Sequence, residues 1–382
     1  MWRRTGVAIS TRRQALDDAL TRLARLHPKK IDLSLGRLQR LLTALGSPQE
    51  SLPPTIHIAG TNGKGSTCAY LSEMSRARGE TVHIYTSPHL VNFNERIRLD
   101  SRPVPDKMLI EAFARCEAAN FGEPITFFEI TTAAAFLLFS EHPADRLILE
   151  VGLGGRYDAT NVIAKPALSV ITPVSLDHQE FLGDNITDIA REKAGICKFG
   201  VPVVIGNQDD AAEEALLAEA QRAGAPAFVW GRDYNAYMQH GRLVYEDENR
   251  VWDLPAPSLI GPHQIQNAGM AAACASVLNW EESSVSTGIG KASWPGRLQN
   301  ITRGPLGEIA NKAGAELWLD GGHNVSAAKA AGLQAETATG LIPAVKHAAK
   351  EHPAPRILIA GSLYLAGEAL ALGGEPPHIT PG

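Results

Sequence analysis

Residues 57–67 read HIAGTNGKGST, and this stretch decides how the chain is expected to fold. It joins the end of an apolar strand to a glycine-rich turn and the start of a helix. Glycines let the backbone approach a ligand closely, so successive N–H groups and the positive end of the helix can converge on phosphate oxygens. Lys64 adds a cation, and the hydroxyls of Ser66 and Thr67 stand where a phosphate loop meets a metal. The Walker pattern is not matched, because Gly65 separates Lys64 from Ser66, and an ordinary strand-to-helix turn with an exposed lysine is the alternative.

The composition narrows the class of protein. The chain has 382 residues, of which 44% are hydrophobic and 20% charged, and this predicts a globular protein of roughly two to three domains. A net charge of -5 argues against nucleic acid as the main partner. No apolar signal core or membrane-spanning run is present, which predicts a cytoplasmic protein without membrane contact. Scattered single cysteines indicate reduced buried thiols rather than a zinc site; they are Cys68, Cys116, Cys197 and Cys274.

Apolar, β-branched runs alternate with amphipathic helical stretches along the first part of the chain. This alternation predicts an α/β fold with a mostly parallel sheet covered by helices on both faces. Ligands are expected at the carboxyl ends of its strands, where the connecting loops converge. The strands are expected at residues 55–59, 82–86, 146–151, 168–172 and 201–205, and two of the helices at 129–140 and 211–223.

Polar side chains follow three of these strands. Ser87 follows the second strand, Glu150 ends the third in an otherwise apolar run, and His178 lies beyond the fourth. A carboxylate at that position is costly to bury without a partner, so magnesium is expected beside Glu150, with the Ser87 hydroxyl as a further ligand. A lone histidine is more often structural than a ligand, so His178 carries little weight on its own.

Three further segments are harder to assign from the residues alone. Lys193 stands next to Arg191 and Glu192, a spacing typical of a solvated helix face. The segment 294-WPGR-297 fits either a plain linker or a hinge whose Arg297 reaches phosphate, and an apolar strand leads into Asp320. We expect a domain boundary near residue 298, which divides the chain into residues 1–297 and 298–382.

The order of these motifs resembles the Mur-ligase superfamily and, within it, the folylpolyglutamate synthases, including the bifunctional dihydrofolate synthases. The phosphate loop of this family has the sequence GTNGKGS, which is also the sequence of residues 60–66. The other motifs that carry the resemblance are IDLSLGR (31–37), YTSPHL (85–90), NERIR (94–98), TFFE (126–129), EVGLGGRYDATN (150–161), LDH (176–178), EKAGI (192–196), PGR (295–297), DGGHN (320–324) and GSLY (361–364).

The resemblance implies roles for individual residues at an ATP and magnesium site. Two magnesium ions would be held by Ser87, Glu150 and His178, with the Ser66 hydroxyl at the phosphate loop. Lys193 would be carbamylated to support the second metal, which replaces the reading as a solvated lysine. Lys64, Lys193, His178 and Arg297 would be the catalytic residues. The ATP contacts would be Asn62, Gly63, Lys64, Gly65, Ser66, Asn267, Arg297, Asp320 and His323.

The reaction that the resemblance implies is the ATP-dependent joining of L-glutamate to dihydropteroate and to reduced folates through an acyl phosphate. The substrate carboxylate would take the γ-phosphoryl group, and the amine of glutamate would then displace phosphate. The enzyme is expected to be a monomer that uses only small-molecule substrates. The pterin-bearing substrate would contact Thr126, Phe127, Phe128, Glu129, Tyr157, Asp158, Ala159, Ser362 and Tyr364.

The C-terminal part departs from the family pattern. It resembles a Rossmann-like α/β domain that lacks about two strand–helix units between DGGHN and GSLY, so its core is expected to be small. Residues 327–350 read as helical and 356–360 as one strand, followed by a Gly/Pro-rich tail. Two alternatives stay open: a cell-wall precursor ligase of the same superfamily, and a nucleotide-binding protein that has lost ligation through this shortening.

Overall fold

The computed structural model describes residues 4–26, 32–322, 341–351, 356–360 and 363–373. Its centre is an eight-stranded sheet in the order β4-β3-β2-β5-β1-β6-β7-β8. The pairs β2–β3 and β3–β4 are antiparallel and all the others are parallel, so the sheet is mostly parallel, which is the class of sheet that the sequence predicts. The strands are β1 (Thr55–Ala59), β2 (Val82–Tyr85), β3 (Ile97–Leu99), β4 (Arg102–Pro103), β5 (Arg146–Glu150), β6 (Leu168–Ile171), β7 (Val203–Ile205) and β8 (Ala227–Val229).

Helices cover both faces of this sheet. On one face α3 (Lys64–Ala77), α9 (His263–Val277) and α10 (Glu282–Lys291) pack on the side chains of Ile56 and Ile58. The other face is covered by α4 (Asp106–Asn120) and α5 (Phe127–Glu141), and farther along by α7 (Ile186–Ala194) and α8 (Asp210–Ala223). Around this body lie α1 (Arg4–Leu23), α2 (Gly36–Ala44), α6 (Gln179–Leu182) and the short 3-10 helices η1 (Pro48–Ser51), η2 (Phe93–Arg96) and η3 (Ala159–Val162).

The predicted boundaries of these elements hold to within one or two residues. The strand expected at 201–205 begins at Val203, because Pro202 has no N–H for the ladder and contributes only its carbonyl, which accepts from the Ser169 N–H. The helix expected at 129–140 begins at Phe127, because Thr126 and Glu129 form a reciprocal capping box. None of the helices in the described ranges is long and apolar enough to cross a membrane.

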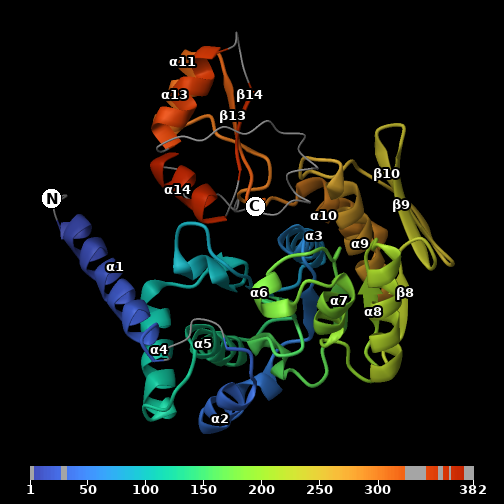
Figure 1. Cartoon of the computed structure of the whole chain (residues 1–382), viewed down its shortest axis with the longest axis horizontal. Helices are drawn as coiled ribbons and strands as arrows, with labels where there is room; N and C mark the ends of the chain where they lie inside the picture. Colours follow the sequence, from blue (N-terminus) through green and yellow to red (C-terminus); the bar gives the residue numbers. More distant parts are fainter. Residues whose placement is uncertain (1–3, 27–31, 323–340, 352–355, 361–362, 374–382) are drawn as a thin grey trace.

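A second, antiparallel sheet lies outside the first one. It consists of β9 (Tyr234–Gln239), β10 (Arg242–Asp247) and β11 (Val251–Leu254), and Figure 1 shows it at the edge of the molecule beside α9. Its inward residues Leu243, Tyr245 and Leu254 are buried in the same core as α3 and α9. This sheet was not predicted from the sequence.

The C-terminal unit is a smaller α/β layer that begins at residue 299. Its three-stranded sheet has the order β12-β13-β14 and lies above the main body in Figure 1. The predicted strand at 356–360 is present, but the expected Gly/Pro-rich tail is wrong for residues 363–373, which form a helix. That segment is rich in Leu and Ala, good helix formers, and it buries Ala366, Ala369 and Leu370. The elements are β12 (Gln299–Asn300), β13 (Glu316–Leu319), β14 (Arg356–Ile359), α11 (Gly304–Lys312), α13 (Leu341–Glu351) and α14 (Leu363–Gly373).

Candidate nucleotide site

The loop between β1 and α3 is held tightly against the end of β6. Gly60 has φ +138°, and a Cβ built there would lie 1.9 Å from the Thr172 Oγ1. The backbone N–H groups of Thr61 and Asn62 both donate to the Pro173 carbonyl, at 3.0 and 3.2 Å. Only glycine fits at position 60, so the loop emerges from the sheet in one fixed direction.

Lys64 begins α3 and its side chain folds back over the loop. The Nζ atom donates to the carbonyl oxygens of Gly60 and Thr61, at 3.0 and 3.1 Å. The ammonium group therefore stands directly beside the glycine-rich turn, where an anion bound by the loop would meet it.

Helix α9 supports the loop from below. Gly63 has φ +89°, and its Cβ would lie 2.4 Å from the Oδ1 of the buried Asn267. The Gln264 side chain links Asn267 to the Ser66 hydroxyl through hydrogen bonds of 3.1 and 3.2 Å. Asn267, which the resemblance assigns to the adenine side, thus lies against the phosphate loop. Gln264 was missed, although its spacing of three residues from Asn267 places both on one helix face.

The segment between α10 and β12 brings a second cation to the loop. A Cβ on Gly65 would lie 2.9 Å from the Trp294 indole nitrogen and 3.6 Å from the Arg297 guanidinium. The guanidinium carbon of the buried Arg98 lies 4.9 Å from the centroid of the Trp294 ring, and this cation–π contact fixes the orientation of Trp294. Arg297 is therefore close to the phosphate loop.

Asp320 orders the chain that carries Arg297. Its two carboxylate oxygens accept the backbone N–H groups of Leu298 and Gly322, at 3.0 and 2.7 Å. Burial lowers the pKa of His263, while the Asp320 carboxylate raises it and the Arg297 guanidinium lowers it. The start of α9 lies beside this segment, since a Cβ on Gly261 would lie 2.6 Å from the His263 ring and 3.3 Å from the Leu298 side chain.

The predicted metal ligands are only partly brought together. The Ser87 N–H donates to the Glu150 carboxylate at 3.2 Å, and Glu150 is only 6% exposed. Burial raises the pKa of Glu150, whereas the charges of Lys64 and Arg297 lower it. His178 is exposed at the start of α6 with φ +50°. Within the described residues, no group of three or more His, Cys, Asp or Glu side chains is arranged to hold a metal.

The loop that carries Ser87 is organised by one carboxylate. Glu95 is buried and accepts the backbone N–H groups of Leu90, Val91 and Asn92, at distances from 2.6 to 3.4 Å. The sequence marks this stretch as unusually polar for a connection within a sheet, but it does not reveal that Glu95 turns inward. This carboxylate fixes the chain between Ser87 and β3.

Lys193 is buried, which shows that the interpretation as a solvated lysine is wrong. It is 4% exposed and its Nζ donates to the Gly60 carbonyl at 3.0 Å. Burial, with a smaller contribution from the Lys64 charge, lowers the pKa of Lys193 to about 7. The loop after β5 covers this end of α7, since a Cβ on Gly155 would lie 2.8 Å from the Lys193 carbonyl oxygen.

The predicted substrate residues divide into structural and accessible groups. Thr126 and Glu129 cap α5, Glu129 also pairs with Arg37 at 3.1 Å, and the Phe128 ring packs against Gly152. Phe127 stacks edge-on against Phe93, and Ala159 is buried. Tyr157, in contrast, is 48% exposed.

Asp158 is oriented away from a substrate. It is 2% exposed, and its two oxygens accept four hydrogen bonds from Gly152, Leu153 and Thr160, which fills the capacity of a carboxylate. The geometry therefore does not favour the predicted direct contact. His323, Ser362 and the Tyr364 side chain lie outside the described residues.

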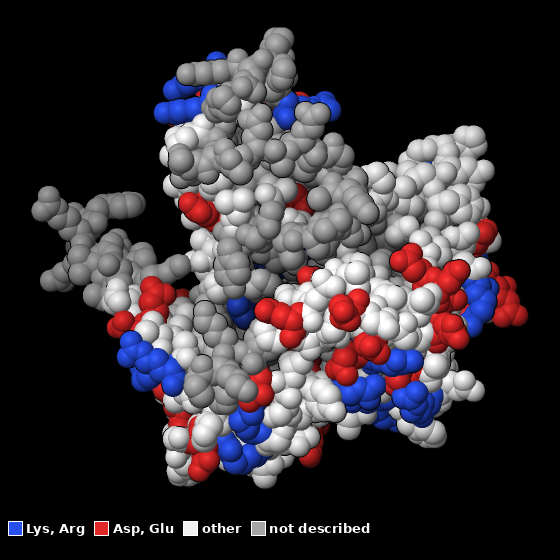
Figure 2. All heavy atoms as spheres, in the orientation of Figure 1, with Lys and Arg blue, Asp and Glu red and all other residues white. Residues whose placement is uncertain are grey.

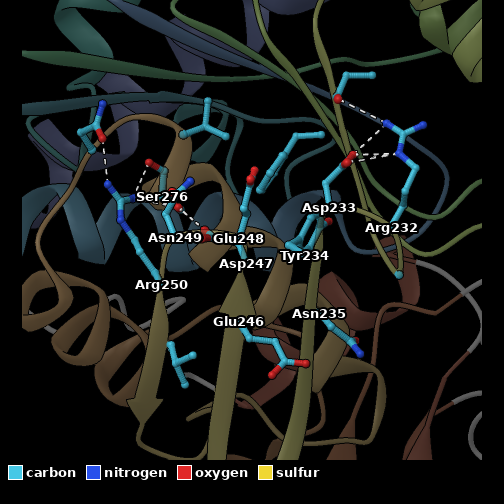
Figure 3. A pocket seen from close by; sticks show the side chains of 16 residues that line it. Arg232, Asp233, Tyr234, Asn235, Glu246, Asp247, Glu248, Asn249, Arg250 and Ser276 are labelled. Atoms are coloured by element: carbon cyan, nitrogen blue, oxygen red, sulfur yellow. Dashed lines mark hydrogen bonds and ion pairs between the residues drawn. The ribbon is translucent and has the colours of Figure 1, made fainter.

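Two hollows differ in their relation to this loop. One of about 540 Å³ is lined by Ser175, Leu176, Asp184, Asn185, Ile186 and Asp209. Ser175 also binds the Thr61 and Asn62 side chains of the phosphate loop, at 3.1 and 3.2 Å. The larger hollow, of about 1000 Å³, lies between the β9–β11 sheet and the far end of α9 (Figure 3). There the two arginines are already engaged, Arg250 by Ser276 and Arg232 by Asp233, so we place the candidate site at the phosphate loop.

Comparison with known proteins agrees with this placement. The family model "Mur ligase middle domain" matches residues 58–275. A Bacillus subtilis dihydrofolate synthase/folylpolyglutamate synthase is 38% identical over 314 residues, which cover 76% of this chain and 69% of the relative. The chain belongs to the dihydrofolate synthase/folylpolyglutamate synthase family of Mur ligases.

Solved structures of this synthase family share the fold over nearly the whole chain. E. coli FolC in complex with DHPP and ADP has a TM-score of 0.80 at 27% identity, covering 93% of this chain and 97% of that one. Mycobacterium tuberculosis folylpolyglutamate synthase complexed with ADP has a TM-score of 0.81 at 28% identity, covering 96% and 100%. The cell-wall precursor ligase that the sequence left open is not supported by these relatives.

Proposed function

We propose that this synthase uses ATP to join L-glutamate to dihydropteroate and to reduced folates. The observation that carries the proposal is the phosphate loop at residues 60–66, with Lys64 beside it and Arg297 brought to it by the segment that leads into the C-terminal unit. The relative with DHPP and ADP bound supports both the nucleotide and the pteridine class of substrate.

The chain's own cations account for the first step. An oxygen of the substrate carboxylate attacks the γ-phosphorus of ATP, the bond to the β,γ-bridging oxygen breaks, and ADP leaves. Lys64 and Arg297 offset the charge on the transferring phosphoryl group. The amine of glutamate then attacks the acyl carbon, phosphate departs, and loss of a proton from nitrogen leaves the amide.

The residues at the end of β5 and after β2 fit magnesium. Glu150 is a buried carboxylate beside the Ser87 backbone, and carboxylate and hydroxyl oxygens are the donors that magnesium prefers. Magnesium bound there would polarise the phosphate oxygens. The Ser66 hydroxyl lies at the loop itself, bonded to Gln264. His178 is a nitrogen donor at an exposed position, so its assignment as a ligand depends on the family resemblance alone.

Lys193 has the environment that carbamylation requires. A lysine amine must be neutral to attack carbon dioxide, and burial lowers the pKa of Lys193 to about 7. The addition would convert the amine to a carbamate with release of one proton. The new anion would lie beside Gly60 and face the charge of Lys64. Isotope-labelled bicarbonate should give a carbamate signal by NMR that Lys193→Arg abolishes.

We also propose where the pterin-bearing substrate binds and where the chain divides into two domains. The pterin-bearing substrate would lie along residues 126–129 and 157–159, with Tyr157 as the exposed aromatic contact, and residues 298–382 would form the second domain. The enzyme would act as a cytoplasmic monomer on small molecules. Figure 2 shows acidic and basic side chains interspersed on the viewed face, without a continuous basic surface.

The decisive experiment measures amide formation with purified protein, ATP and magnesium. Glutamate is offered together with dihydropteroate or, separately, tetrahydrofolate, and the product is identified by mass, with Lys64→Ala as the control. Amide formation that requires Lys64 would establish the ligase and its substrate. ATP binding without product would instead favour the nucleotide-binding protein that has lost ligation.

A further inference from the structure

A buried histidine connects the phosphate-loop strand to a loop about a hundred residues away in sequence. His57 lies in the middle of β1 with an exposure of 0%, and its Nε2 is 2.8 Å from the Thr160 hydroxyl. Burial lowers the pKa of His57 to about 3, so the ring is neutral. Ile56 and Ile58, its neighbours in the strand, face the opposite core around α3 and α9.

The directions of the hydrogen bonds are fixed by what each group can donate. The Thr160 hydroxyl donates to the Asp158 Oδ1 at 2.5 Å, so it must accept at its remaining position from the His57 Nε2–H. Asp158 in turn accepts the N–H groups of Gly152 and Leu153 on its other oxygen, at 3.1 and 2.9 Å. The His57 Nδ1 is buried without a hydrogen-bond partner, a cost that an aliphatic residue at this position would avoid.

The loop formed by residues 152–160, which His57 reaches through Thr160 and Asp158, is tightly packed. A Cβ on Gly152 would lie 2.5 Å from the Phe128 ring, and one on Gly155 would lie 2.7 Å from the Glu192 carbonyl oxygen at the end of α7. The loop starts directly after Glu150 and carries the exposed Tyr157. A shift of this loop would therefore move the predicted substrate contacts relative to the phosphate loop.

We propose that His57 is a positioning residue for the pterin-bearing substrate, acting through Thr160 and Asp158 to hold residues 152–160 in place relative to the phosphate loop. The phosphate loop begins three residues beyond His57 on the same strand, so β1 sets the position of both loops. This inference rests on the proposed function. His57 is not proposed as a catalytic residue, because its imidazole is fully buried and cannot contact a substrate.

The chain provides a matched control in His83. It lies in β2 of the same sheet with an exposure of 2%, its Nε2 donates to the His142 carbonyl, and its Nδ1 accepts the Asp100 N–H. Its partners belong to other loops. Removing His83 should therefore cost stability without reaching residues 152–160.

The test compares His57→Leu, His57→Gln and His83→Leu in steady-state kinetics and hydrogen–deuterium exchange. We expect His57→Leu to raise the KM for dihydropteroate about tenfold while the KM for ATP stays within about twofold, since ATP is held by the intact loop. Exchange of residues 152–160 should accelerate. His57→Gln keeps an N–H within reach of Thr160 and should recover most of the loss, and His83→Leu should change neither readout.

If His57→Leu does not fold, Thr160→Val and Thr160→Ser make the same comparison, because serine keeps the hydroxyl and valine removes it. An unchanged KM for dihydropteroate, or an equal rise in both KM values, would overturn the inference while leaving the ligase established. If the wild-type chain forms no amide, the proposed function fails instead. Exchange at 152–160 then decides whether His57 holds this loop through Thr160 and Asp158, with unchanged exchange in His57→Leu counting against it.

Discussion

The two α/β parts of this synthase obtain their cores in different ways. The eight-stranded sheet is covered on both faces by helices of its own segment, in three large buried clusters. The three-stranded sheet of the C-terminal unit has one small cluster, and Leu90 and Val91 from the loop after β2 pack against it. The first part can build the nucleotide loop alone, whereas the second part supplies Asp320, which binds the Leu298 N–H next to Arg297, and depends on the first part for packing.

The largest expected effect tests the first part. Lys64→Ala removes the cation at the phosphate loop without touching a buried cluster, so we expect kcat to fall by about a thousandfold or more with little change in the unfolding midpoint. Lys291→Ala, at the exposed end of α10, is the control for loss of a lysine. Wild-type turnover in Lys64→Ala would refute the assignment of the site.

The second prediction tests the contact between the two parts. A Cβ on Gly367 in α14 would lie 1.9 Å from the Leu90 carbonyl oxygen, so Gly367→Ala must push the C-terminal unit away from the loop that carries Ser87. We expect kcat/KM to fall by about a hundredfold, because Arg297 would be displaced by about an ångström. Glu368 is the next residue and is exposed, so Glu368→Ala should keep the kcat/KM of the wild type. Normal activity in Gly367→Ala would mean that this docking is dispensable.

The third prediction concerns pH and the buried amine at the nucleotide site. Burial lowers the pKa of Lys193 to about 7 from its ordinary 10.5. Between these values the unfolded chain binds a proton that the folded chain does not, so stability should rise as the pH is raised through this window. Lys193→Met should flatten that slope and raise the free energy of unfolding near pH 7 by about 2 kcal/mol, while abolishing activity.

Urea unfolding at several pH values in buffer free of carbon dioxide checks this slope. Lys107→Met changes an exposed lysine on α4 that pairs with Glu111 at 3.7 Å, and it should leave the slope unchanged. Parallel stability curves for the wild type and Lys193→Met would show that the Lys193 amine keeps its ordinary pKa in the folded chain.

The smallest effect is expected in the β9–β11 sheet, which lies away from the loop. The Nε atom of Arg242 lies 2.7 Å from the Oδ1 atom of Asp253, and the two side chains are 49% and 68% exposed. Arg242→Ala should change the free energy of unfolding by no more than about 0.5 kcal/mol and leave kcat unchanged. A loss of activity here would show that this sheet contributes to the site after all.

The sequence predicts five of the eight strands of the large sheet, because the signal for these strands is local, whereas the short strands β3, β4 and β8 were not predicted. Runs such as residues 55–59 are apolar, β-branched and bounded by glycine or proline, and the phosphate loop follows from the same stretch. The burial of Lys193 could not be predicted from its charged neighbours, because it depends on Gly155 packing against α7 from a loop nearly forty residues earlier. Gln264 and Glu95 were missed for the same reason, since each acts on backbone or side chains that only the tertiary fold brings near.

The packing of Leu90 and Val91 against the C-terminal unit matters for anyone recombining this enzyme with a relative. The linker near residue 298 looks like a natural crossover point, yet a chimera joined there would set a foreign helix against the native Leu90 carbonyl and its neighbours. Residues 88–91 should therefore travel with the donor's C-terminal unit. The segments that must be exchanged together are separate in sequence but adjacent in the folded structure.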